Sequence, residues 1–127
     1  MARPQLPLPT LGAQELAIMK VIWRLKDVSV REVYETLRER RPVAYTTVMT
    51  MMNTLEGKGY LKKELAGRAF RYRPAVPERR VVTRMVKEFV ERVFDGSSAP
   101  LLAHLVTSTE LSDEEREELR RLIDGAK

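Results

Sequence analysis

The periodicity of the sequence changes at Gly59, and this change restricts the folds that the chain can form. Before Gly59, apolar residues recur at helical spacing in three segments, and the glycine itself is a typical helix end. After it, Leu61–Leu65 and Ala69–Arg73 alternate around the turn Ala66-Gly67-Arg68, as the two strands of a hairpin do. Three helices followed by a two-stranded hairpin predict a winged helix-turn-helix, whose third helix is the candidate recognition helix.

The starts of these helices are indicated by their capping residues. Gly12 is an acceptable N-cap for the first helix, and the Glu15 carboxylate three residues later can accept backbone N–H groups. Ser29 and Glu32 form a Ser-x-x-Glu capping box that begins the second helix. We expect the third helix to extend from about Tyr45 to Lys58.

The third helix has an unusual composition on one face. On a helical wheel, Met51, Met52 and Leu55 cluster with Val48 on a core face. The opposite face is polar but uncharged, and it contains Thr46, Thr47, Thr50, Asn53 and Thr54. Threonine is a poor helix former, so this face requires an explanation. Hydroxyl groups and methyl groups can approach base edges, and asparagine can pair with adenine, so base recognition is one explanation. Packing against another protein is the alternative.

The hairpin that follows is basic and would lie beside this helix as a wing. Arg68 occupies its turn, and Lys62, Lys63, Arg71 and Arg73 lie on its strands, where they could contact phosphates or enter the minor groove. A solvated strand face is the simpler interpretation of these charges. Lys58 is either a phosphate contact or a charge that favours the helix C-terminus. The predicted DNA contacts are Tyr45, Thr46, Thr47, Thr50, Asn53, Thr54, Lys58, Lys62, Arg68 and Arg71.

Charge is distributed unevenly between the two parts of the chain. Residues 1–75 contain 14 Lys and Arg against 7 Asp and Glu, whereas residues 76–127 contain 9 against 11. The proline-rich N-terminus predicts a disordered tail at 1–10. The difference in charge predicts a polyanion-binding winged-helix domain at 11–75 and a helical region with another role at 76–127.

The second part has too few residues to bury a good core alone. We expect helices from Pro77 to about Phe94, from Ala99 to about Val106, and after a capping box at Ser112. A core shared with a second copy would place two recognition helices on a palindromic operator, whereas packing back on the winged helix is the alternative. The predicted dimerisation residues are Met85, Phe89, Val93, Leu101, Leu102, Leu105, Leu119, Leu122 and Ile123.

Composition excludes several other functions. The 127 residues contain no cysteine and one histidine, His104, so a thiolate metal site, a cysteine nucleophile and a three-histidine zinc site within one chain are impossible. We expect no cofactor and no enzyme activity. No apolar run approaches the roughly 18 residues of a membrane span, and no secretory signal is evident, so a cytoplasmic protein without membrane insertion is expected.

Several motifs resemble the penicillinase-repressor family of BlaI- and MecI-type regulators. They are Leu11-Gly12-Ala13-Gln14-Glu15, Ile18-Met19, Trp23, Val30-Arg31-Glu32-Val33, Ala44-Tyr45-Thr46-Thr47-Val48-Met49-Thr50, Leu55-Glu56-Gly57-Lys58-Gly59, Arg71-Tyr72, Phe94-Asp95-Gly96-Ser97 and Leu111-Ser112-Asp113-Glu114-Glu115. The resemblance implies a dimeric repressor on a dyad operator, with DNA contacts from the recognition helix and wing. In resistance members it also implies a membrane sensor metalloprotease that cleaves the repressor in its dimerisation region.

The chain departs from that pattern at two places. Thr54 stands where members often carry arginine, which leaves the operator sequence open. His104 and Leu105 occupy the positions that match the cleaved bond, where asparagine and phenylalanine are typical, so proteolytic induction does not follow from the resemblance. His104 is alternatively a pH-sensitive interface residue or simple packing. Two functions compete with the sequence-specific repressor: a winged-helix protein-interaction module and a non-specific architectural DNA-binding protein.

Overall fold

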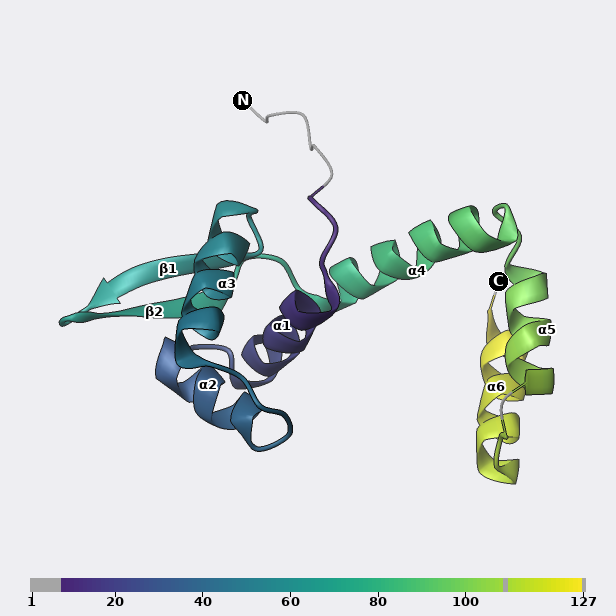
Figure 1. Ribbon diagram of the computed structural model, residues 1–127. Helices are drawn as coiled ribbons and strands as arrows, with labels where there is room; N and C mark the ends of the chain where they lie inside the picture. Colours follow the sequence, from purple (N-terminus) through teal and green to yellow (C-terminus); the bar gives the residue numbers. More distant parts are fainter. Residues whose placement is uncertain (1–7, 109, 127) are drawn as a thin grey trace. The chain divides into compact units, whose positions relative to one another are not determined.

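The computed structural model describes residues 8–108 and 110–126, and within these ranges the chain forms six helices and one hairpin (Figure 1). In chain order the elements are α1 (Ala13–Leu25), α2 (Val30–Arg38), α3 (Tyr45–Gly57), β1 (Leu61–Ala66), β2 (Ala69–Pro74), α4 (Glu78–Phe94), α5 (Ser98–Ser108) and α6 (Asp113–Gly125). The mostly helical fold with a small β-hairpin wing is therefore confirmed, and each element lies within a few residues of its predicted position.

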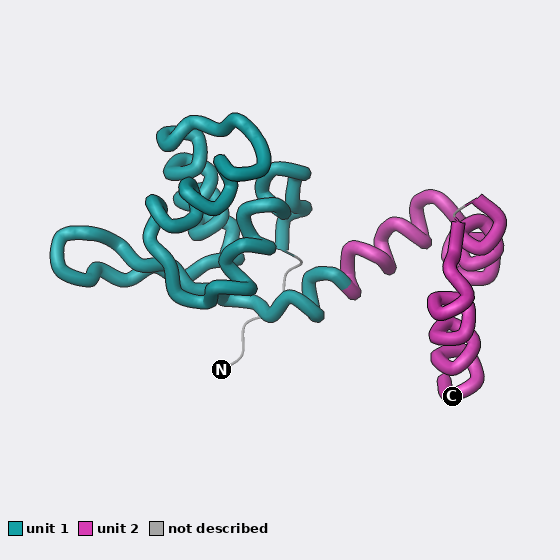
Figure 2. The backbone as a smooth tube through the Cα atoms, turned by 90° about the horizontal axis from the view of Figure 1, so that it is seen from below, with its two compact units in different colours: residues 1–82 teal, residues 83–127 magenta. Residues whose placement is uncertain are grey.

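The chain divides into two compact units, residues 1–82 and residues 83–127 (Figure 2). The division falls inside α4 rather than at residues 75–76, where the composition of the sequence changes. The first turn of α4 thus belongs to the first unit, and Val81 within it is only 5% exposed. Just before it, the indole N–H of Trp23 donates to the Val76 carbonyl oxygen at 2.9 Å and ties the segment entering α4 to α1.

The predicted helix caps are present. The Gly12 N–H donates to Glu15 Oε1 at 2.8 Å at the start of α1. At the start of α2, the Ser29 N–H donates to Glu32 Oε1 at 2.8 Å and the Glu32 N–H donates to Ser29 Oγ at 3.2 Å. The same reciprocal pair joins Ser112 and Glu115 at α6. These short-range bonds explain why the helix starts were predictable from local sequence.

The core of the first unit lies where α1, α2 and α3 meet. Its most deeply buried side chains come from all three helices and from the turn after α1: Ile18, Met19, Ile22, Val28, Val33, Val48, Met52 and Leu55. Burying each such side chain contributes about 1.5–3 kcal/mol. The position of α3 is therefore fixed by packing of its inner face, while its outer face is free to serve another role.

The hairpin pairs in antiparallel register from Leu61 opposite Pro74 to Ala66 opposite Ala69. Gly67 in its turn has a φ of 68°, a left-handed conformation that glycine adopts without strain. At the base of the hairpin, Tyr72 forms two backbone hydrogen bonds with Val28, at 2.7 and 3.0 Å. The wing is therefore tied to the turn between α1 and α2.

Part of the expected tail at residues 1–10 falls outside the described residues. Of the remainder, Pro9 is held by the Tyr60 hydroxyl, which donates to its carbonyl oxygen at 2.5 Å. Within residues 8–108 and 110–126, no helix combines the length and the apolar character needed to cross a membrane.

Candidate nucleic-acid interface

Helix α3 has one buried face and one exposed face, as the helical wheel predicts. Val48, Met52 and Leu55 have no solvent exposure, and Met51 is half-buried. The predicted contact residues of this helix, Tyr45, Thr46, Thr47, Thr50, Asn53 and Thr54, are all exposed. The Thr54 hydroxyl donates to the Thr50 carbonyl oxygen at 3.0 Å, so it keeps only its acceptor capacity for a ligand. The exposed face carries no charge, and Tyr45 and Met49 add apolar surface to this helix, with 37% and 39% exposure.

The N-terminus of α3 differs from those of α2 and α6, where a serine side chain caps the helix. Its N-cap residue, Ala44, makes no side-chain cap hydrogen bond, and its first turn contains no acidic residue. Backbone N–H groups at an uncapped helix start carry partial positive charge and suit a phosphate oxygen. The start of α3 therefore adds anion affinity to a face that otherwise lacks charge.

Beside this helix start, aromatic and basic side chains of α2 form a row. The Tyr34 and Tyr45 rings pack edge to face with centroids 5.5 Å apart. The Arg31 guanidinium lies 5.4 Å from the centre of the Tyr45 ring, and that of Arg38 lies 5.6 Å from Tyr34. In helix-turn-helix proteins the helix before the recognition helix crosses the DNA backbone, so Arg31 is a candidate phosphate contact. Arg31 is not among the contacts predicted from the sequence, although its place in the first turn of the second helix was a usable signal.

The predicted wing residues are not equivalent. Lys62 at the start of β1 and Arg68 in the turn are exposed. Arg73 pairs with Glu64 at 3.4 Å on the surface, where such pairs contribute little. The tip of the wing also has apolar surface, since Leu65 and Phe70 are 60% and 43% exposed.

Arg71 is engaged within the protein. Its Nε donates to Asp27 Oδ1 at 3.0 Å, its Nη2 to the Asp27 carbonyl oxygen at 2.9 Å, and its Nη1 lies 3.2 Å from Glu32 Oε1. The Ser29 N–H, with a smaller effect from Arg71, holds the pKa of Glu32 below its usual value. Arg71 thus joins β2 to Asp27 and to the start of α2, a role that differs from the DNA contact predicted from the sequence.

Lys58 is likewise engaged, in an ion pair with Glu15. Its Nζ lies 2.8 Å from Glu15 Oε2 and 3.0 Å from Oε1, and the two side chains are 28% and 10% exposed. Burial alone would raise the pKa of Glu15, but the Gly12 N–H and Lys58 outweigh it and lower the pKa. The pair joins the end of α3 to the start of α1, which neither sequence interpretation of Lys58 included.

Asn53 faces the wing. Its Oδ1 accepts a hydrogen bond from the Tyr72 hydroxyl at 2.9 Å and one from Lys63 Nζ at 3.3 Å. Tyr72 is 2% exposed, and burial raises the pKa of its phenol, followed by smaller effects of Glu56 and Tyr45. The phenol therefore remains a neutral donor at physiological pH.

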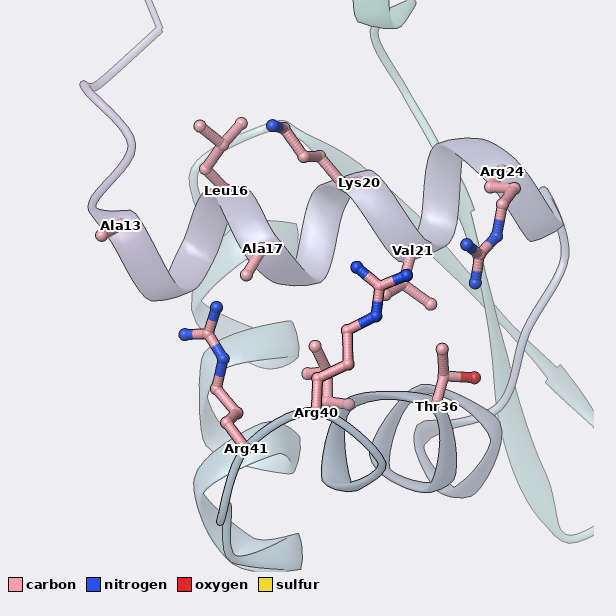
Figure 3. Close-up of a pocket in the computed structure, with 10 residues that line it drawn as sticks. Ala13, Leu16, Ala17, Lys20, Val21, Arg24, Thr36, Arg40 and Arg41 are labelled. Carbon is pink, nitrogen blue, oxygen red and sulfur yellow. The ribbon is translucent and has the colours of Figure 1, made fainter.

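A second basic surface lies between α1 and the turn after α2 (Figure 3). It is a groove of about 340 Å³ around which Lys20, Arg24, Arg40 and Arg41 gather, with no acidic residue in its lining. No residue of α3 or of the hairpin lines this groove. The positive charge of the first unit thus extends beyond the recognition helix and the wing, and adds to its long-range attraction for polyanions.

The predicted dimerisation residues are largely exposed in the single chain. Phe89 and Val93 in α4 are 40% and 50% exposed, and Leu122 and Ile123 in α6 are each 59% exposed. Of the others, Leu102 and Leu105 are exposed, and Met85, Leu101 and Leu119 are half-buried. His104 and Leu105 lie inside α5, and both are exposed.

Among the described residues, no group of three or more His, Cys, Asp or Glu side chains could hold a metal ion.

Three packed helices, an exposed polar third helix and an adjoining hairpin define a winged-helix protein. A family model described as penicillinase repressor matches residues 11–125. The chain belongs to the penicillinase repressor family, which confirms the resemblance that the motifs indicated.

Individual relatives agree with this assignment. The transcriptional regulator BlaI of Mycobacterium tuberculosis (strain CDC 1551 / Oshkosh) is 34% identical over 118 residues, which cover 91% of this chain and 84% of that protein. The penicillinase repressor of Bacillus licheniformis is 28% identical over 120 residues, 94% of each chain. The solved DNA-binding domain of the repressor BlaI matches with a TM-score of 0.52 and 33% identity, over 57% of this chain and 88% of that one. The monomeric form of Bacillus licheniformis BlaI in complex with the blaP half-operator matches the same shares with a TM-score of 0.50.

Proposed function

We propose that this protein is a sequence-specific transcriptional repressor that binds a palindromic operator as a homodimer. The observation that carries the proposal is the exposed, uncharged threonine face of α3 beside a basic hairpin. Solvent-exposed helix faces are normally charged, whereas hydroxyl and methyl groups suit the edges of bases in the major groove. A BlaI relative with the same fold has been solved in complex with a half-operator, which supports DNA binding by the winged helix of this chain.

The proposed contacts fall into two groups. The first group would contact base edges or nearby phosphates and supply the sequence preference; it comprises Thr46, Thr47, Thr50 and Thr54. The second group would contact the DNA backbone or the minor groove and supply affinity; it comprises Arg31, Tyr45, Lys62 and Arg68. We assign Lys58 and Arg71 to internal ion pairs instead, because their cationic groups already have acidic partners.

Dimerisation is supported by the apolar side chains that the second unit leaves exposed. Phe89, Val93, Leu122 and Ile123 are each at least 40% exposed, and no residue of α5 or α6 that the structure describes is buried. Helices without a buried face require a partner surface to be stable, and a second copy supplies a self-complementary one. Two linked modules also raise the effective concentration of the second half-site contact.

The test is selection from a pool of random DNA duplexes, followed by footprinting of the enriched sequence at physiological salt. A protected dyad with half-sites one or two helical turns apart is expected. Thr50→Ala should reduce the preference for the selected duplex more than the affinity for unrelated DNA, whereas Thr36→Ala, a matched change in α2, should not. Salt-dependent binding without preference would favour an architectural protein, and no DNA binding would favour a protein-interaction module.

Induction by proteolysis at His104–Leu105 is a separate proposal. Both residues lie within α5, and a protease needs its substrate in an extended form, so α5 must unfold locally before cleavage. Limited proteolysis by a membrane sensor metalloprotease, with mass spectrometry of the fragments, tests it. A fragment ending at His104 together with loss of the dimer is expected, and cleavage elsewhere would contradict it.

A further inference from the structure

Three elements of the interface meet at the side-chain oxygen of Asn53. This oxygen belongs to α3, and its two donors, Tyr72 and Lys63, belong to the two strands of the wing. Tyr72 and Lys63 are directly opposite each other in the hairpin register, so their side chains emerge on the same face of the wing. Lys63 also lies 4.8 Å from the centre of the Phe70 ring.

These contacts limit what Asn53 can recognise. A carboxamide oxygen has two lone pairs, and two donors already use them. Bidentate pairing with adenine needs that oxygen to accept from the adenine amino group. Asn53 could form such a pair only by losing a hydrogen bond that its oxygen accepts from the wing. Its Nδ2 group could still donate a hydrogen bond to DNA without that loss.

The base of the wing is more firmly held than its tip. Tyr72 is buried, and its backbone pairs with Val28 on one side and with β1 on the other. From Lys62 to Phe70, by contrast, every hairpin residue is exposed. At about 3.3 Å per residue, the turn lies roughly 10 Å beyond Lys63. A small rotation of the hairpin about Tyr72 therefore produces a larger displacement at Arg68, in the turn that would meet DNA.

We propose that Asn53 is a positioning residue, which sets the angle of the wing against α3 through Tyr72 and Lys63 and so determines where the wing meets DNA when α3 lies in the major groove. The expected effect on DNA binding rests on the proposed function. The expected effect on the angle of the wing rests only on the hydrogen bonds of Asn53. It revises the sequence expectation that Asn53 reads adenine.

The structural part is testable without DNA. Because the chain contains no cysteine, Lys20→Cys and Ala66→Cys give unique sites for two spin labels, one on α1 and one near the wing tip. Pulsed electron resonance should show a shifted or broader distance distribution in Tyr72→Phe, which keeps the buried ring and loses only the hydroxyl. Asn53→Ala should change it similarly, and the double variant should add nothing further. An unchanged distribution in Tyr72→Phe would overturn the proposal.

Tyr60→Phe is the matched control, since it removes a hydroxyl whose acceptor is Pro9 rather than α3. Its label distances should equal those of the parent. The unfolding temperature of each variant, followed by Trp23 fluorescence, confirms that the winged helix is intact.

The second arm measures DNA preference. The ratio of dissociation constants for a scrambled and a selected duplex should fall about fivefold to tenfold in Tyr72→Phe, the effect expected for one hydrogen bond, with an unchanged salt slope. A loss of preference in Asn53→Ala but none in Tyr72→Phe would mean that Asn53 reads a base directly, and would refute the proposal. If the parent protein prefers no duplex, the proposed function fails, and the label distances still decide whether Asn53 positions the wing.

Discussion

Replacing Glu15 by glutamine should destabilise the winged helix by about 1–2 kcal/mol. The amide can still accept the Gly12 N–H, so the helix cap persists and only the charge opposite Lys58 is lost. At an N–O distance of 2.8 Å, the gross attraction is about 6 kcal/mol with an effective dielectric constant near 20. Desolvation of both groups offsets most of it, but Glu15 is only 10% exposed, so the net contribution exceeds that of a surface pair.

Thermal unfolding followed by Trp23 fluorescence measures this change. Trp23 is the only tryptophan, and it is 8% exposed in α1, so its emission reports on the first unit. For a unit of this size the expected loss corresponds to a decrease of about 5–10 °C in Tm. Glu64→Gln is the matched control, because it removes an exposed pair with Arg73 and should cost less than about 0.5 kcal/mol.

The pH dependence of the difference provides a second criterion. The pKa of Glu15 is lower in the folded protein than its ordinary value of 4.5, so the pair contributes fully above that value. The contribution is lost as the pH falls through the folded-state pKa, where parent and Glu15→Gln should melt together. Equal melting at pH 7, or a difference that persists in acid, would refute the reasoning.

Three further predictions concern charge and assembly. Arg68→Ala should weaken binding to all duplexes similarly and reduce the salt slope by about one, and a selective loss on the preferred duplex would contradict the assigned role of the wing. Lys58→Met should lower the Tm but leave the salt slope unchanged, whereas a reduced slope would restore Lys58 as a phosphate contact. Phe89→Asp should sediment as a monomer with weak operator binding, while Lys87→Asp on the same helix remains dimeric; a persistent Phe89→Asp dimer would exclude this interface.

The order of elements was predictable from the sequence because its signals are local. The Ser29 and Ser112 caps, the glycine turn of the hairpin and the apolar spacing of α1 and α3 each act within a few residues, and all appear in the structure. The exposed threonine face followed from the same helical period. Fold class and the outer face of α3 thus required no knowledge of distant contacts.

The pairings of the charged wing and helix residues were not predictable in this way. Lys58 meets Glu15 from 43 positions earlier in the chain, and Arg71 meets Asp27 from 44 positions earlier. A lysine at a helix end and an arginine on a basic strand look the same in sequence whether they face solvent, DNA or a carboxylate. Only the packing of α1 against α3 and β2 decides between these environments, which explains why two predicted contacts proved to be internally paired.

The uncapped start of α3 has a consequence for local stability. Helices α2 and α6 each begin with a serine whose side chain caps the helix, whereas Ala44 has no side-chain acceptor for the first amides of α3. In the free protein, the Tyr45, Thr46 and Thr47 amides should therefore exchange their hydrogens with solvent quickly. A phosphate oxygen bound at this position would act as the missing cap and slow that exchange. A DNA phosphate would then cap the N-terminus of α3, so that operator binding and the ordering of the first turn of α3 occur as one step.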